Sequence, residues 1–199
     1  MNYNTIFSAD SHYFHSNIIN YQNRPFENAA QMNKRMIDGW NSVANEDTVA
    51  YFLGDFLLGG EGGERLVGSI LSQLKFAHLH FISGNHDNHF HRWYKQTQPK
   101  NITLYGPYVE GKINNQRITL SHYPILSWNK KSKGSWMLHG HSHGNIKATS
   151  KNSKSIGKIL DVGVDTNNFV PYTFEEISKI MANRPVVGEL EEIIDHHIN

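Results

Sequence analysis

The chain has 199 residues, a formal net charge of +1 from 19 Lys+Arg and 18 Asp+Glu, and no Cys, which predicts a single domain over residues 1–199 without disulfides or thiolate metal sites. The near-neutral charge argues against a protein dedicated to binding duplex nucleic acid, so nucleic acid is expected only as a substrate. Because residues 1–10 lack a basic segment followed by an apolar one, and no eighteen apolar residues run together, we expect a cytoplasmic protein with no membrane partner.

The first half of the chain predicts alternating strands and helices. Met32, Met36 and Trp40 recur at helical spacing, which is typical of a helix with one apolar face. The run that ends at Leu53 is apolar and partly β-branched, as expected of a buried strand. The expected strands are residues 3–9, 48–53 and 78–82, and the expected helices are residues 28–44 and 66–74. This alternation predicts an α/β fold with its active site at the carboxyl ends of the strands.

The second half predicts another sheet. Two strand-like segments flank Asn114-Asn115-Gln116 and therefore predict a hairpin. Thr173 with Glu176 has the spacing of a capping box, which predicts the start of a helix. The expected strands are residues 108–113, 117–121, 136–138 and 159–164, and the expected helices are 173–181 and, more weakly, 189–197. We therefore expect a two-sheet sandwich flanked by helices, with the second sheet the more antiparallel one.

Thirteen His residues are present, and many follow the expected strands. Imidazole is the commonest metal-ligating side chain in proteins. Short Asp-x-His and Gly-Asp motifs are weak by themselves, because such sequences are also common in turns. A Gly-Asn-His-Asp or Gly-His-Ser-His motif is more specific, because Gly permits a sharp exit from a strand. The five motifs are Asp10-x-His12, Gly54-Asp55, Gly84-Asn85-His86-Asp87, Ser121-His122 and Gly140-His141-Ser142-His143.

In this order the five motifs resemble the calcineurin-like metallophosphoesterase superfamily, over the segment from Asp10 to His143, about two thirds of the chain. The segment from Asp10 to Phe26 is also similar to small bacterial and phage phosphoesterases. Those proteins commonly have Phe-Gly-His where this chain has Tyr13-Phe14-His15, so its loop conformation is expected to differ. The resemblance implies a metallophosphoesterase fold and a hydrolase that uses two divalent cations.

The resemblance also implies a role for each motif residue. The ligands implied for the first metal are Asp10, His12 and His143, and those for the second are Asn85, His122 and His141. Asp55 would bridge both metals, since each carboxylate oxygen can face one cation. His86 would be the proton donor. Nitrogen and oxygen ligands suit Mn²⁺, Fe, Zn²⁺ or Ni²⁺ better than Ca²⁺, and the resemblance favours Mn²⁺.

Three further residues have alternative roles. Asp87 is assigned to catalysis, as the acceptor that orients His86, although it would also suit the cap of the next helix. Arg24 is assigned to substrate binding through a phosphate oxygen, although an Arg before Pro is often structural. His15 is assigned to substrate binding as well, with an ordinary loop position as the alternative.

The leading hypothesis is a phosphodiesterase that hydrolyses a small nucleotide, or a similar phosphorylated molecule, through attack by a metal-bridging hydroxide. A phosphomonoesterase is the first alternative, and Arg24 would then contact the terminal phosphate oxygens. A nuclease is the next alternative, against which the near-neutral charge speaks. A non-catalytic scaffold is the last, against which the complete set of motifs speaks. The oligomeric state stays open.

Overall fold

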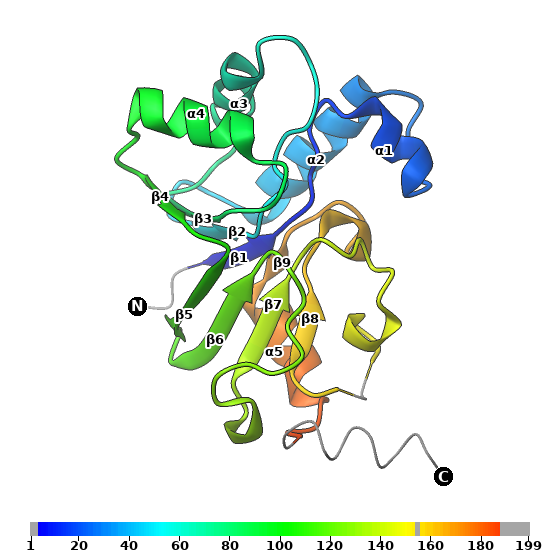
Figure 1. Ribbon diagram of the computed structural model, residues 1–199, viewed down its shortest axis with the longest axis vertical. Helices are drawn as coiled ribbons and strands as arrows, with labels where there is room; N and C mark the ends of the chain where they lie inside the picture. The colour runs from blue at the N-terminus through cyan, green and yellow to red at the C-terminus, as the bar shows by residue number, and fades with distance from the viewer. Residues whose placement is uncertain (1–3, 154–155, 188–199) are drawn as a thin grey trace.

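The computed structural model describes residues 4–153 and 156–187. The chain forms two mixed β-sheets that pack together, with helices around them (Figure 1). The strand order is β4-β3-β2-β1-β9 in the first sheet and β5-β6-β7-β8 in the second. The predicted α/β architecture of two sheets flanked by helices is therefore confirmed.

The first sheet is parallel except at one edge. It contains β1 (Thr5–Ser8), β2 (Val49–Phe52), β3 (His78–Ile82), β4 (Ile102–Tyr105) and β9 (Tyr172–Thr173). Strands β1 to β4 run parallel, whereas β9 pairs antiparallel with β1. The three strands predicted in the first half are present. Strands β4 and β9 were not predicted, and the two residues of β9 are too few to give a pattern.

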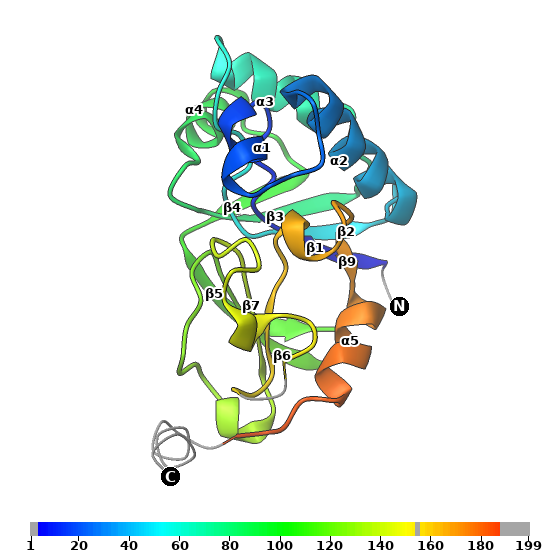
Figure 2. The ribbon, with the colours of Figure 1, turned by 90° about the vertical axis from the view of Figure 1, so that its right-hand side faces the viewer.

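Four helices lie on the outer side of the first sheet (Figures 1 and 2). They are α1 (Ser16–Tyr21), α2 (Ala29–Val43), α3 (Gly63–Leu71) and α4 (Asn88–Thr97). The Asn28 side chain accepts a hydrogen bond from the Gln31 N–H and so caps α2, which confirms the predicted helix. Helix α1 was not predicted, since six residues give little periodicity. Apolar side chains of these helices join the core that covers this face of the sheet, as where Phe90 stacks on Phe81.

The second sheet contains β5 (Tyr108–Ile113), β6 (Gln116–Ser121), β7 (Trp136–His139) and β8 (Ile159–Asp161). The hairpin of β5 and β6 is present as predicted and pairs antiparallel over its full length. The second sheet is thus the more antiparallel one, as expected, since β9 pairs antiparallel with β1 over two residues. Strand β6 nevertheless pairs parallel with β7, and β7 with β8. Residues 122–135 and 140–158 are long enough to return the chain to the start of each next strand.

A buried cluster between the sheets includes Phe7 and Leu53 from the first sheet side and Leu138 and Leu160 from the second. Helix α5 (Phe174–Ala182) adds apolar residues to the same cluster, and its predicted capping box is present. The weaker helix predicted over residues 189–197 lies outside the described residues. In the described part of the chain, no helix combines the length and the apolar character needed to cross a bilayer.

The parallel strands of both sheets bring their carboxyl ends to one region. Beyond β1 and β8 the two sheets meet directly, because Ala9 forms a parallel β-bridge with Gly163 and accepts a hydrogen bond from the Val164 N–H at 3.0 Å. Loops that follow strands of different sheets therefore lie side by side. The five sequence motifs all occupy such loops or begin at a strand end.

Candidate metal centre

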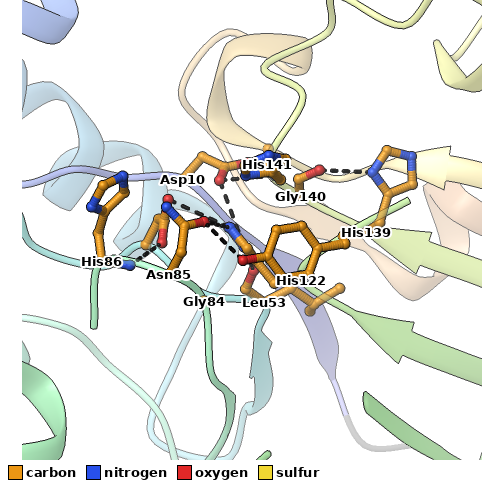
Figure 3. Close-up of polar contacts among 12 residues, drawn as sticks. Asp10, Leu53, Gly84, Asn85, His86, His122, His139, Gly140 and His141 are labelled. Atoms are coloured by element: carbon orange, nitrogen blue, oxygen red, sulfur yellow. Dashed lines mark hydrogen bonds and ion pairs between the residues drawn. The ribbon is translucent and has the colours of Figure 1, made fainter. Parts of the chain in front are cut away.

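Two groups of metal-ligating side chains lie at this junction. Within each group the candidate ligand atoms lie within 4.8 Å of one another. The first group is Asp10, His12 and His143, and the second is Asp55, His122 and His141. Each group takes side chains from loops of both sheets. The structure thus brings together six of the seven residues that the sequence predicted as ligands. The seventh, Asn85, adjoins the second group, since its Oδ1 lies 2.9 Å from His122 Nε2 (Figure 3).

Asp55 lies between the two groups. Its Oδ2 is 3.5 Å from His12 Nε2 and 3.5 Å from His122 Nε2, so one carboxylate oxygen faces an imidazole of each group. Its Oδ1 accepts a hydrogen bond from the His86 N–H at 2.9 Å. This is the position that a bridging ligand would occupy.

Gly54 makes this position possible. Its φ of 83° lies in the left-handed region, and a Cβ atom there would lie 2.6 Å from the Gly84 backbone. The loops that follow β2 and β3 therefore approach each other more closely than any side chain at Gly54 would permit. Their approach sets Asp55 beside Asn85.

The ligand loops have unusual backbone conformations. Five of the seven predicted ligands have a positive φ, between 49° and 66°. They are Asp10, His12, Asp55, His141 and His143. A non-glycine residue in such a conformation costs about 1–3 kcal/mol, so the surrounding contacts must hold it in place. Concentrated strain of this kind is typical of functional sites.

The first group fits a divalent cation. Both ring nitrogens of His12 are buried and make no hydrogen bond with the residues that the structure describes. Burial lowers the pKa of His12 to about 3, against the opposing charge of Asp55, so the ring is neutral and its lone pair is available. Burial and the Asp161 carboxylate raise the pKa of Asp10 well above its usual range. A cation would satisfy both the unpaired imidazole and the excess of carboxylates.

The second group fits a cation as well. His122 Nδ1 lies 2.8 Å from the carbonyl oxygen of Leu53, which can only accept, so this nitrogen carries the proton of the neutral ring. His122 Nε2 then faces Asn85 and Asp55 as a third acceptor. The lone pairs of His122 Nε2, Asn85 Oδ1 and Asp55 Oδ2 repel one another unless a proton or a cation lies between them. Burial lowers the pKa of His122, but the hydrogen bond and charge of Asp55 outweigh it and raise the pKa above its usual value.

Asp165 is a site residue that the sequence analysis missed. Its Oδ2 lies 2.7 Å from His143 Nδ1 and thereby fixes the orientation of that ring. Burial raises the pKa of Asp165, but hydrogen bonds with His143 and Arg24 outweigh it and keep the pKa below its usual value. The signal was available, because Asp165 follows shortly after β8, as the other motifs follow their strands.

The structure corrects the assignment of Arg24 to substrate binding. The Arg24 side chain is 0% exposed and forms an ion pair with Asp165. The guanidinium also donates to the carbonyl oxygens of Ser11, at 3.0 Å, and Asp10, at 2.8 Å. With its donors directed into the protein, Arg24 supports the loop of the first group. The structural role considered for an Arg before Pro25 is the one observed.

Asp87 also has a different role from the one predicted. Its carboxylate accepts hydrogen bonds from the backbone N–H groups of Asp55 at 3.0 Å, Phe56 at 2.9 Å and Gly84 at 2.6 Å. Within the described chain it neither orients His86 nor caps α4 through its side chain. Asp87 instead joins the loops after β2 and β3. It is therefore a positioning residue.

Asp161 fixes the loop that contains His141 and His143. Its Oδ2 accepts from Ser142 Oγ at 2.7 Å and from the Gly144 N–H at 2.8 Å. The neighbouring His139 is not part of the centre, because its Nδ1 lies against the Gly140 carbonyl and its ring lies apart from the ligands (Figure 3). Asp161, like Asp165, was not predicted.

A pocket of about 300 Å³ opens over the two groups. Its lining includes His86, the predicted proton donor, and His15, one predicted substrate contact. The remaining lining residues are His12, Ile18, Tyr21, Asp55, Leu58, Asn85, His141 and His143. A larger cavity of about 680 Å³, beside Asn4 and Glu175, contains none of the candidate ligands.

The two-sheet sandwich with grouped His and carboxylate ligands at its strand ends is the architecture of a metallohydrolase. The family model described as calcineurin-like phosphoesterase matches residues 4–188. The chain belongs to this family. It is accordingly a phosphoric ester hydrolase by family, with the two candidate metal groups at its strand ends.

Similar proteins are found both by sequence and by structure. The uncharacterized protein MJ1445 of Methanocaldococcus jannaschii is 30% identical over 185 residues, which are 93% of this chain and 95% of that protein. AQ665 from Aquifex aeolicus, a protein of unknown function, has a TM-score of 0.65 at 22% identity and covers 89% of this chain and 98% of its own. The E. coli phosphoesterase YfcE has a TM-score of 0.44 at 14% identity over 80% and 77%. AQ665 supports the fold, and the likeness to YfcE is too weak to bear on function.

Proposed function

We propose that this protein is a phosphodiesterase that acts with two divalent cations, Mn²⁺ being the preferred ion, on a small nucleotide or a similar diester. The observation that carries the proposal is the position of Asp55, whose Oδ2 is 3.5 Å from an imidazole of each ligand group. Asp10, His12 and His143 would hold one cation, and Asn85, His122 and His141 the other. Asp55 would contact both.

Two cations held about 3.5–4 Å apart would polarise a phosphate, activate water and stabilise the leaving oxygen. The protein's own residues would do the rest. Asp165 and the Leu53 carbonyl keep the rings of His143 and His122 in their orientations. His86, with its backbone tied to Asp55, would place its ring over the scissile ester and donate a proton to the leaving alcohol.

The charge of the pocket supports a diester over a monoester. Among the residues that the structure describes, no Lys or Arg lines it. The dianion of a monoester would be held best by additional cationic side chains around its terminal oxygens, whereas a diester carries a single negative charge. Arg24 was the candidate for that task, and its guanidinium is bound to Asp165 instead.

A hydrolysis panel tests this proposal. Protein reconstituted with Mn²⁺ would be assayed on bis-p-nitrophenyl phosphate, p-nitrophenyl phosphate, cyclic nucleotides and single-stranded DNA, with the metal content measured in parallel. We expect two metals per chain and a higher kcat/KM for the small diesters than for p-nitrophenyl phosphate. Preference for the monoester, or for DNA, would replace the proposal with one of the alternative activities.

Asp55→Asn is the test variant for that panel, and Asp47→Asn is its matched control. The substitution keeps the side-chain shape but removes the charge that would neutralise both cations, so turnover should fall to background. Asp47→Asn, at an exposed Asp before the start of β2 and so at the opposite end of that strand from Asp55, should leave turnover unchanged. Activity of Asp55→Asn close to that of the unmodified protein would contradict the proposal.

A further inference from the structure

One wall of the pocket over the ligand groups is apolar, although the ligands themselves are polar. Ile18 and Leu58 line this wall, and Tyr21 continues it outward. Tyr21 is 68% exposed, the highest value among the large hydrophobic residues that the structure describes as exposed. A large, exposed aromatic residue at the mouth of a pocket is a common feature of ligand-binding surfaces.

Aromatic rings lead from the first ligand group to this wall. The centroids of His12 and His15 are 5.8 Å apart, and those of His15 and Tyr21 are 6.2 Å apart with the rings edge to face. His86 adjoins the same series, with its centroid 5.8 Å from that of His12. The proposed proton donor and Tyr21 therefore line one pocket, with His12 and His15 between them.

The backbone holds the wall in place. Ile18 is 5% exposed, and its N–H donates to the His15 carbonyl at 3.3 Å. The Leu58 N–H donates to the Tyr13 carbonyl at 3.3 Å, next to the β-bridge between Tyr13 and Leu57. The wall is thus formed before a ligand arrives, and the ring of Tyr21 presents an uncovered surface beside it.

We propose that Ile18, Tyr21 and Leu58 form a stacking shelf for a planar ring of the substrate, and that this ring is a nucleobase attached to the diester. The proposal rests on the proposed function. The shelf contains no Asp, Glu, Lys, Arg or His side chain, so its ligand is an uncharged group. A tyrosine side chain beside two aliphatic ones suits a flat aromatic ring, because base stacking on an aromatic residue depends on the π-face and tolerates different bases.

The expected contribution is measurable. Stacking of a base on an aromatic side chain is worth about 5- to 150-fold in affinity. Because Tyr21 is largely exposed, we expect the lower part of this range, about tenfold. Adenosine 5′-monophosphate has a base where ribose 5-phosphate has the C1 hydroxyl group, and both have the same phosphate, so the ratio of their dissociation constants separates the shelf from the phosphate site.

The experiment measures binding of these two probes to Mn²⁺-loaded protein by calorimetry. We expect adenosine 5′-monophosphate to bind about tenfold more tightly than ribose 5-phosphate. Tyr21→Ala should abolish the difference without changing metal content, Tyr21→Phe should preserve it, and Tyr108→Ala, at an exposed tyrosine on β5, should have no effect.

Equal binding of the two probes, no binding of either, or an unchanged ratio in Tyr21→Ala would each overturn the shelf. Failure of the proposed function looks different. If the proposed function fails, the protein will show no Mn²⁺-dependent turnover of bis-p-nitrophenyl phosphate. If only the shelf fails, that turnover will remain.

Discussion

Arg24 and Asp165 lie 141 positions apart in the chain and form a two-point ion pair, with Nε 2.7 Å from Oδ1 and Nη2 2.8 Å from Oδ2. Asp165 also binds His143 Nδ1, and Arg24 also donates to the carbonyl oxygen of Asp10. The pair therefore supports two ligands of the first group, one from each sheet. Its position outside the ligand shell suggests that it tunes metal binding without contacting the metal.

Asp165→Asn should weaken Mn²⁺ binding at the first group. The amide lacks the negative charge that Asp165 places beside His143 Nδ1 to hold the ring in its orientation, and loss of such a partner typically costs about 10- to 100-fold in metal affinity. A Mn²⁺ titration of the metal-free protein should show one binding phase weakened and the other retained. Asp47→Asn serves as the surface control. Two unchanged phases in Asp165→Asn would show that the carboxylate does not support the metal site.

Arg24→Met should lower the free energy of unfolding by about 3 kcal/mol, because it leaves the largely buried Asp165 carboxylate without its cationic partner. Urea denaturation of the metal-free protein measures this change. Combining Arg24→Met with Asp165→Asn should cost less than the sum of the two single changes, since the stranded charge is then removed. Arg65→Met, at an exposed arginine of α3, is the matched control. Additive costs would rule out a direct energetic link between the two residues.

His86→Asn should retain both metals yet lower kcat, since general acid assistance contributes about 10²–10⁴-fold. Nitrophenolate leaves without much protonation, whereas a ribose alkoxide needs a proton. The loss in kcat/KM should therefore be much greater on a nucleotide diester than on bis-p-nitrophenyl phosphate. Equal losses on both substrates would show that His86 acts in another way, and loss of metal would make it a ligand.

His80 should make folding stability depend on pH. Burial, together with the neighbouring His78, lowers the pKa of His80 to about 4, so the folded protein favours the neutral ring, which stacks on Tyr51. The unfolded chain takes up this proton near pH 6.5, so the contribution is complete above that value and is lost as the pH falls toward 4. His80→Gln should show a smaller loss of stability between pH 7 and pH 5 in urea denaturation. An equal loss in both proteins would contradict this role.

Much of the candidate site follows from local sequence. Asp10, Asp55 and Asn85 each come shortly after a predicted strand, and parallel strands of one sheet present their carboxyl ends at one edge. His122 and His141 were grouped only through the family resemblance, because the second sheet was expected to be the more antiparallel one. Short apolar runs with polar ends are therefore enough to gather the ligands that the first sheet supplies, even where the exact strand limits differ.

The supporting contacts could not be predicted in this way. Asp87 and Arg24 have donors and acceptors that suit several partners, and the sequence does not specify which backbone groups will lie beside them. Asp87 binds backbone N–H groups of a loop more than thirty positions earlier, which only the close approach at Gly54 brings into range. The direction of β7 likewise depends on the path of residues 122–135, whose composition is compatible with either direction.

Each ligand group draws side chains from loops of both sheets, and this has a mechanical consequence. A cation in the first group would join position 10 to position 143, and one in the second would join position 55 to position 122. Such ions would act as cross-links that close long loops, the task that disulfides perform in other small proteins, in a chain that has no Cys. Metal supply would then govern how long the protein stays folded as well as how fast it turns over substrate. Chelation of the metals should therefore shorten the lifetime of the folded state.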